Sequence, residues 1–263
     1  MLSKTANNIR QSRFFQFFLK VDYFDILGVV IVLGTSLVLH YWSKPLSASW
    51  FFHGESNAFT RLPLLGLFAT ASAVASILST RFIAKQRALG NTISWINVVV
   101  AGVVDFFNGN VGAFLTYPIS MVTNWLPTKT WSRYQRVGRV KPFILIGLIL
   151  LSITVSFGLN AFAFRFSGWG LDAMYWFSST TFALALTADI LNIFRIKDQW
   201  YIWSVYNVAN LGKALIQGNF ANVGKYSYYI INSLIAILTW TVKREAKIRP
   251  NHLNHTETAI EGE

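Results

Sequence analysis

Long apolar segments recur along the whole chain, and they limit its possible folds more than any other feature of the sequence. These segments reach the roughly 18 residues that an α-helix needs to cross the hydrocarbon core of a bilayer. Of the 263 residues, 53% are hydrophobic and only 13% are charged. Because hydrocarbon offers backbone groups no partner outside their own segment, such segments form helices. We therefore predict an all-α polytopic membrane protein.

The apolar segments predict eight transmembrane helices. An extra amino-terminal helix is expected over residues 22–42, after a basic segment over residues 1–20 that is expected to lie at the membrane surface. The seven further helices are expected over residues 62–80, 92–107, 111–127, 142–164, 172–194, 200–217 and 221–242. The polar tail over residues 244–263 is expected to be disordered.

The distribution of positive charge orients these helices. With the amino terminus inside, the inner segments hold 18 of the 23 lysines and arginines, the outer loops hold three and the helices hold two. Cytoplasmic loops carry such an excess, so both termini are expected in the cytoplasm. The same pattern explains the net charge of +12 without nucleic-acid binding. The absence of cysteine fits a bacterial inner membrane.

An internal repeat relates two parts of the sequence. Residues 94–98 (SWINV) resemble residues 204–208 (SVYNV) at an offset of 110, and the triplet NGN at 108–110 resembles QGN at 217–219 at an offset of 109. The two three-helix units start four spans apart and share one orientation, which predicts a parallel 3+1+3 repeat with the substrate between the halves. The expected parts are residues 1–60 (basic segment, extra helix and outer loop), 61–128 (first unit), 129–167 (basic loop and linker helix), 168–243 (second unit) and 244–263 (tail).

A polar stripe marks the helix that is expected over residues 200–217. At 100° per residue, Trp200, Trp203, Asn207, Asn210 and Gln217 fall within an arc of roughly 100°. An unpaired amide in hydrocarbon costs several kcal/mol, so this face is expected to look into protein or into a wet cavity. Tryptophan faces beside amides indicate a site for a flat, polar small molecule.

We predict a substrate site from this stripe and its counterparts in the repeat. Asn97 corresponds to Asn207, and Asn108 corresponds to Gln217. The predicted substrate-binding residues are Trp200, Trp203, Asn207, Asn210, Asn97, Asn108 and Gln217. The alternatives are structural: an interface anchor for Trp200, helix–helix ties for the two paired asparagines, and helix caps for Asn108 and Gln217.

Ionisable residues inside the expected helices are few. Asp105, Asp189 and Lys213 are candidates because membrane proteins use such residues for function, although Asp105 and Lys213 lie near enough to the outer edge to reach water. Coupling to protons is not indicated, because no deep chain of carboxylates is present. Four tyrosines are expected mainly to pack, with one or two reaching a ligand: Tyr117, Tyr226, Tyr228 and Tyr229.

Sequence motifs of catalysis are missing from the chain. It has no HExxH, no phosphate-binding glycine loop and no nucleophile beside a recognisable base. We therefore expect no enzymatic activity, no cofactor and no metal. A membrane-embedded enzyme and a channel are the distant alternatives to a transporter.

The spacing Trp200-x-x-Trp203-x-x-x-Asn207 resembles the WxxWxxxN/D motif of the PnuC vitamin transporters. The 3+1+3 arrangement is similar to theirs, the likeness covers about residues 60–243, and some members have an extra amino-terminal helix. The resemblance implies a fold like that of the SWEET sugar transporters, a homotrimer, and facilitated diffusion of a vitamin or nucleoside.

Among the cargoes of that family, the residues favour nicotinamide riboside. Its ring is flat and permanently cationic, and a tryptophan face attracts such a cation by roughly 0.5–2 kcal/mol. Thiamine, riboflavin or another nucleoside is the alternative. The expected pocket carries no arginine, so the phosphorylated mononucleotide is expected to be rejected. Transport is expected to occur by alternating access, in which the two three-helix units move about the central site. A passive carrier of this kind cannot concentrate its substrate, so net import is expected to depend on phosphorylation by a cytosolic nicotinamide riboside kinase.

Overall fold

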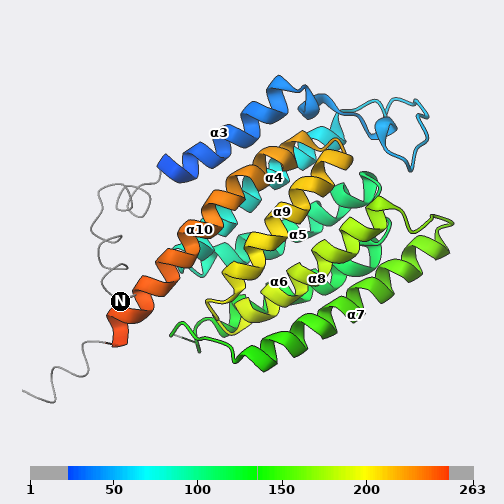
Figure 1. The fold of residues 1–263 in the computed structure, drawn as a ribbon. Helices are drawn as coiled ribbons and strands as arrows, with labels where there is room; N and C mark the ends of the chain where they lie inside the picture. Colours follow the sequence, from blue (N-terminus) through cyan, green and yellow to red (C-terminus); the bar gives the residue numbers. More distant parts are fainter. Residues whose placement is uncertain (1–22, 135, 249–263) are drawn as a thin grey trace, which may run out of the picture.

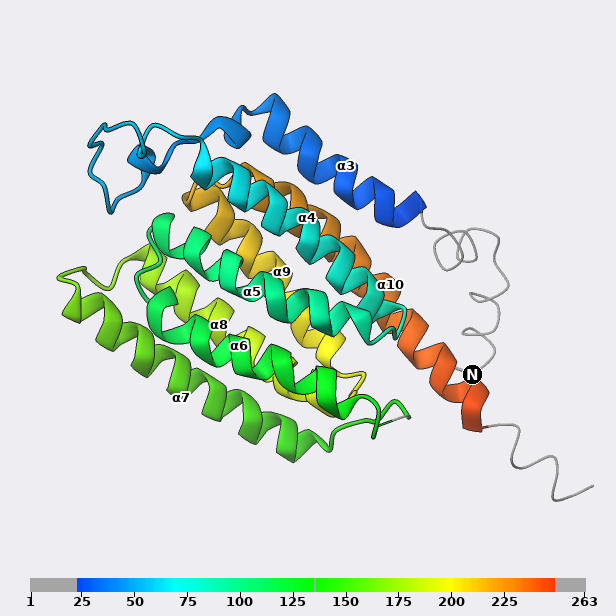
Figure 2. The same ribbon diagram turned by 180° about the vertical axis from the view of Figure 1, so that it is seen from behind.

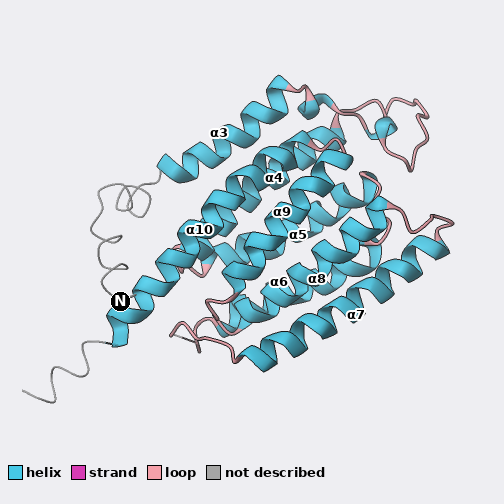
Figure 3. Cartoon of the chain, in the orientation of Figure 1, coloured by secondary structure: helices cyan, strands magenta, loops and turns pink. Residues whose placement is uncertain are grey.

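The protein is described here by a computed structural model, which describes residues 23–134 and 136–248. The expected surface segment over residues 1–20 and the tail from residue 249 lie outside the described residues. The α-helices of the described residues are α3 (Tyr23–Val38), α4 (Leu64–Ala84), α5 (Leu89–Phe107), α6 (Ala113–Thr130), α7 (Pro142–Phe166), α8 (Ala173–Ile193), α9 (Gln199–Ile216) and α10 (Phe220–Ile248). Each predicted helix has its counterpart, and the described residues contain no β-strand (Figure 3).

The helices form two groups that pack against each other. In the first group α5 packs against both α4 and α6, and in the second α9 packs against both α8 and α10. Contacts between α4 and α10 and between α6 and α8 join the groups. The linker helix α7 lies along α8 and α6 at one side of the bundle, whereas α3 lies against α4 and α10 at the opposite side (Figures 1 and 2).

The turns of the two groups have matching backbone geometry. At one end of the bundle, Gln86 and Arg195 have positive φ angles of 61° and 54°, and at the other end Gly109 and Gly218 have φ angles of 98° and 59°. Each pair is separated by 109 positions, which is the offset of the sequence repeat. We call these ends the Arg195 end and the Gly218 end. The equivalence of the two groups as a SWEET-like repeat stays a prediction that this geometry supports.

Three helices are long and apolar enough to cross a membrane by length and composition, namely α4, α5 and α7. The apolar helix α3 has 16 residues and falls below that length. Of these three helices, α7 is the most apolar and the least buried, as expected for a helix that faces lipid. Membrane crossing by all eight helices therefore stays a prediction.

A buried ionic contact fastens α3 to the bundle. Asp25 of α3 accepts hydrogen bonds from Arg81 Nε and Lys85 Nζ at 2.5 Å each, and Arg81 also donates to Asn232 Oδ1 at 2.8 Å. The sequence had placed Arg81 just beyond its helix as a cytoplasmic charge. The structure corrects this, because α4 continues to Ala84 and Arg81 is only 3% exposed. Similarly, α10 continues past its expected end at residue 242 to Ile248.

Gly66, in the first turn of α4, allows a close approach of the preceding loop. A Cβ at this position would overlap the carbonyl oxygen of Tyr41 and lie 2.6 Å from that of Trp42, and both are backbone atoms. We expect Gly66→Ala to lower the free energy of unfolding by about 1–3 kcal/mol, because the loop has to move away. Thermal unfolding of the detergent-purified protein measures this effect.

Gly147→Ala is the matched control for this substitution. Gly147 lies in α7, and a Cβ there meets nothing within 4 Å. Alanine in an open helical position is expected to leave the melting temperature equal or slightly higher. Equal melting temperatures for the two variants would contradict the close approach at Gly66.

Candidate functional site

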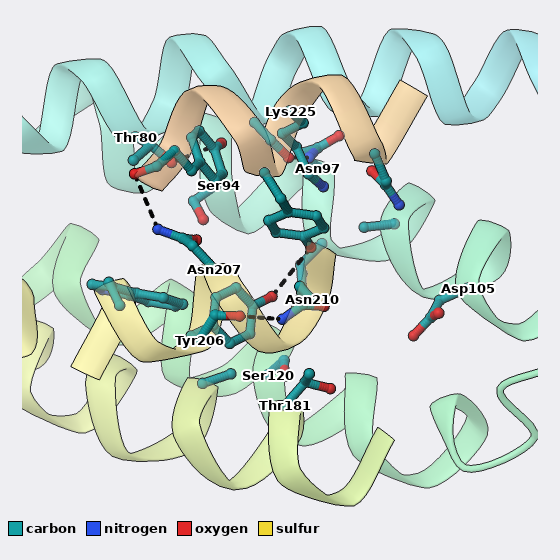
Figure 4. Close-up of a pocket in the computed structure, with 18 of the residues that line it drawn as sticks. Thr80, Ser94, Asn97, Asp105, Ser120, Thr181, Tyr206, Asn207, Asn210 and Lys225 are labelled. Carbon is teal, nitrogen blue, oxygen red and sulfur yellow. Dashed lines mark hydrogen bonds between the residues drawn. The ribbon is translucent and has the colours of Figure 1, made fainter. Parts of the chain in front are cut away.

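A cavity of about 190 Å³ lies between the two helix groups. All six helices of the groups line it, whereas α3 and α7 contribute no lining residue (Figure 4). Its wall is rich in hydroxyl and amide side chains. Those from α4 are Ser72, Ser76, Ser79 and Thr80, and those from α8 include Ser178, Thr181 and Asn192. A polar cavity enclosed by two groups of helices is a geometry that suits a small polar ligand.

The predicted site residues come together in this cavity with one exception. Trp200, Trp203, Asn207, Asn210, Gln217 and Asn97 all line it. Asn108 does not. It lies at the end of α5, where its side-chain oxygen accepts hydrogen bonds from Lys44 Nζ at 3.2 Å and Tyr41 OH at 3.5 Å. Burial lowers the pKa of Lys44 in this contact. Asn108 thus ties the outer loop to α5. Its Nδ2 also donates a hydrogen bond to Val104 O at 2.8 Å at the end of α5, which is the kind of contact that the helix-cap alternative expected.

The two tryptophans of the motif have different surroundings. Trp200 is 1% exposed and packs edge-on against Trp240 at 5.8 Å, within a cluster that includes Trp131. Trp203 is half-buried and has its ring centroid 4.8 Å from that of Tyr206, nearly at right angles. Trp200 therefore closes the Arg195 end of the cavity by packing, whereas Trp203 offers a ring to the interior.

Three asparagines use their amide nitrogens to hold the wall of the cavity. Asn97 Nδ2 donates to Ser72 O at 3.1 Å, Asn207 Nδ2 donates to Tyr229 O at 3.2 Å, and Asn210 Nδ2 donates to Tyr206 O at 3.1 Å. Because each acceptor is a backbone carbonyl, the orientation of each amide is set. Their side-chain oxygens accept no hydrogen bond from the described residues, so they are acceptors that a ligand can use.

Tyrosines from α9 and α10 continue the aromatic wall that Trp203 begins. The ring centroids of Tyr206 and Tyr226 lie 6.0 Å apart with their hydroxyls 3.5 Å apart, and the ring centroids of Tyr226 and Tyr229 also lie 6.0 Å apart. Tyr229 accepts a hydrogen bond from Thr80 at 2.9 Å. The sequence expected one or two of four tyrosines to reach a ligand, namely Tyr117, Tyr226, Tyr228 and Tyr229. Of these, Tyr117, Tyr226 and Tyr229 line the cavity.

A buried carboxylate closes the Gly218 end. Asp105 on α5 accepts hydrogen bonds from Lys213 at 2.7 Å, Gln217 at 2.7 Å, Asn110 at 2.6 Å and Tyr117 at 3.2 Å. Lys213 and Gln217 belong to the α9 side, so the contact crosses between the two groups. From the sequence, Asp105 and Lys213 were candidates for function that also lie near enough to the outer edge to reach water. In the structure they are 9% and 5% exposed and pair with each other.

Two further charged residues line the cavity. Asp189 on α8 accepts hydrogen bonds from Thr123 at 3.0 Å and Asn124 at 2.8 Å. Lys225 on α10 has its ammonium 4.4 Å from the ring of Tyr226. The sequence counted Lys225 as a helix residue without a role, and no periodicity argument could show that it faces the same cavity as Asp189.

The fold and this cavity define a polytopic transport protein, and comparisons identify the family. Residues 66–242 match the family model of the nicotinamide mononucleotide transporters, so the chain belongs to that family and is a multi-pass membrane protein. The chain also has the fold seen in the crystal structure of the Vitamin B3 transporter PnuC. The two are 16% identical with a TM-score of 0.60, covering 85% of this chain and 92% of that chain. No curated protein matches the chain.

Proposed function

We propose that this protein imports nicotinamide riboside by facilitated diffusion. The observation that carries the proposal is one cavity between two helix groups that is lined both by Trp203 and tyrosine rings and by Asn97, Asn207 and Asn210, whose side-chain oxygens are free to accept hydrogen bonds. The rings suit a flat cationic base. The oxygens suit the amide and hydroxyl donors of a nucleoside. Membership of the family supports a cargo related to vitamin B3.

Transport by this protein is proposed to occur by alternating access. The contacts that close the two ends, around Trp200 and around Asp105, would open in turn as the helix groups move. Such a carrier is passive, so net uptake depends on phosphorylation of the cargo by a cytosolic kinase. We propose further that the protein is a homotrimer in a bacterial inner membrane with both termini inside; the charge pattern supports the orientation, and the resemblance supports the trimer.

Uptake into liposomes tests this function. Purified protein is expected to equilibrate labelled nicotinamide riboside across the membrane with saturable kinetics. Because the cargo is a cation, the membrane potential is held at zero in this experiment, and an imposed proton or sodium gradient is then expected to leave the end point unchanged. Trapping a riboside kinase with ATP inside should turn equilibration into accumulation. Accumulation that follows an ion gradient without the kinase would contradict passive transport, and recovery of altered substrate would indicate an enzyme.

The mononucleotide is a second candidate cargo because of one observation. The described lining contains no arginine, which agrees with the expected rejection of a phosphate, but it does contain Lys225, whose ammonium donates no hydrogen bond to a described residue. We retain rejection as the prediction, because a single lysine lacks the two-pronged geometry of an arginine. Uptake of mononucleotide by phosphatase-free liposomes would overturn it.

A further inference from the structure

Two nearly fully buried charges line the cavity without an ion-pair partner among the described residues. Asp189 and Lys225 are 4% and 6% exposed. Asp189 uses only Oδ2 for its hydrogen bonds to Thr123 and Asn124, and its Oδ1 accepts none from the described chain. A buried charge is costly unless it is compensated, and a cationic ligand can supply the charge opposite to that of Asp189.

Asp189 lies toward the Arg195 end of the cavity, and Lys225 lies nearer the Gly218 end than Asp189 does. Asp189 is in the last turns of α8, which ends at the Arg195 end, and Lys225 is in the second turn of α10, which begins at the Gly218 end. Asn124, which holds Asp189, also accepts a hydrogen bond from Ser94 at 2.6 Å. Figure 4 shows Ser94 beside Thr80 and Asn207 at one end of the cavity and Asp105 at the other, with Lys225 between them.

Asp189 shares its level in the bundle with Trp203. Asp189 is about one turn before the end of α8, and Trp203 is about one turn after the start of α9. Because a short loop joins these helices, the carboxylate and the indole are both about one helical turn from the Arg195 end. A cation stacked on Trp203 would thus lie on the Asp189 side of the cavity.

We propose that Asp189 and Lys225 are specificity-determining charges that orient the cargo. In this proposal, which rests on the proposed function, the cationic ring of the nucleoside faces Asp189 and its ribose points toward Lys225. Asp189 supplies the counter-charge that selects a cationic ring, and Lys225 repels a cation from the opposite half. The pair therefore sets both the charge preference of the cavity and the direction in which the cargo lies.

A matched pair of ligands tests this proposal by calorimetric titration: nicotinamide riboside and its reduced 1,4-dihydro form, which has an uncharged ring of nearly the same shape. The wild type is expected to prefer the cationic form. Asp189→Asn keeps the size and the hydrogen-bonding oxygen, and it should weaken binding of the cationic form about tenfold while changing that of the reduced form less than about twofold. Lys225→Gln should instead strengthen binding of the cationic form.

Asp172→Asn is the control, because Asp172 caps the same helix α8 outside the cavity and accepts a hydrogen bond from Tyr175 N at 3.1 Å. It should leave both affinities unchanged. Suppose that the wild type binds the riboside, but that Asp189→Asn weakens the binding of both forms equally or leaves the binding of both unchanged. The orienting role would then be wrong, and the proposed function would stand. If the wild type binds neither form, the proposed function fails, and the inference fails with it.

Discussion

Replacing Trp203 by alanine is expected to raise the dissociation constant for nicotinamide riboside between about 5- and 150-fold, because stacking on an aromatic ring contributes about 1–3 kcal/mol per base. Trp203 is the tryptophan of the motif whose ring is half-buried at the cavity, edge-on to Tyr206. Trp203→Phe keeps a ring and should recover part of the affinity. Calorimetric titration of the purified variants measures both effects.

Trp176→Ala is the matched control for this prediction. Trp176 lies on α8 with 56% of its surface exposed and does not line the cavity. Its loss should leave the dissociation constant unchanged. An unchanged affinity in Trp203→Ala, with a normal melting temperature, would contradict a stacking role and leave Trp203 as a packing residue.

Removing the Asp105 carboxylate is expected to be the most destabilising single change of those considered. Asp105→Ala leaves Lys213 buried without its partner and removes the acceptor of the Gln217, Asn110 and Tyr117 hydrogen bonds. Breaking a buried ion pair from one side costs about 3–5 kcal/mol. Thermal unfolding in detergent should show a correspondingly large fall in melting temperature.

The double variant Asp105→Ala with Lys213→Met separates the ion pair from simple loss of packing. Removing both charges takes away the uncompensated ammonium, so part of the lost stability should return. Asp172→Ala, which removes only a helix cap, is expected to cost about 1 kcal/mol. If the double variant is as unstable as the two single changes added together, the Asp105–Lys213 pair carries no coupling.

The helices and most of the candidate site could be predicted because both depend on local periodicity. Apolar segments long enough to cross hydrocarbon leave helix as their only conformation, so all eight helices were located to within a few residues at most ends. The face of α9 with Trp203, Asn207 and Asn210 followed from the same rule, since polar groups avoid lipid. Residue spacing along one helix contains this information.

The other features of the candidate site depend on contacts between helices, and the sequence of a single helix does not determine such contacts. Asn108 resembled a pocket residue by its place in the repeat, but the loop over residues 39–63 folds back and supplies Lys44 as its partner. Arg81 resembled a cytoplasmic charge, but Asp25 from the extra helix compensates it within the bundle. That Asp189 and Lys225 line one cavity follows only from the packing of α8 and α10 around α9.

The same limit applies to the outer loop. From the sequence, this loop was expected only to connect two helices. In the structure, Trp50 donates a hydrogen bond to Phe106 O at 2.6 Å, and its ring centroid lies 5.1 Å from that of Trp169. The loop thereby packs on the Gly218 end of α5 and reaches the α7–α8 connection. Such contacts join residues more than 50 positions apart, and helical spacing cannot predict them.

The central claim is that the cavity binds nicotinamide riboside selectively. Calorimetric titration of the purified wild-type protein with nicotinamide riboside, thiamine and riboflavin tests it most directly. We expect saturable binding of the riboside, weaker binding of thiamine, whose ring is also flat and cationic, and no binding of the larger, neutral riboflavin. Tighter binding of thiamine or riboflavin, or no binding of the riboside, would contradict the claim.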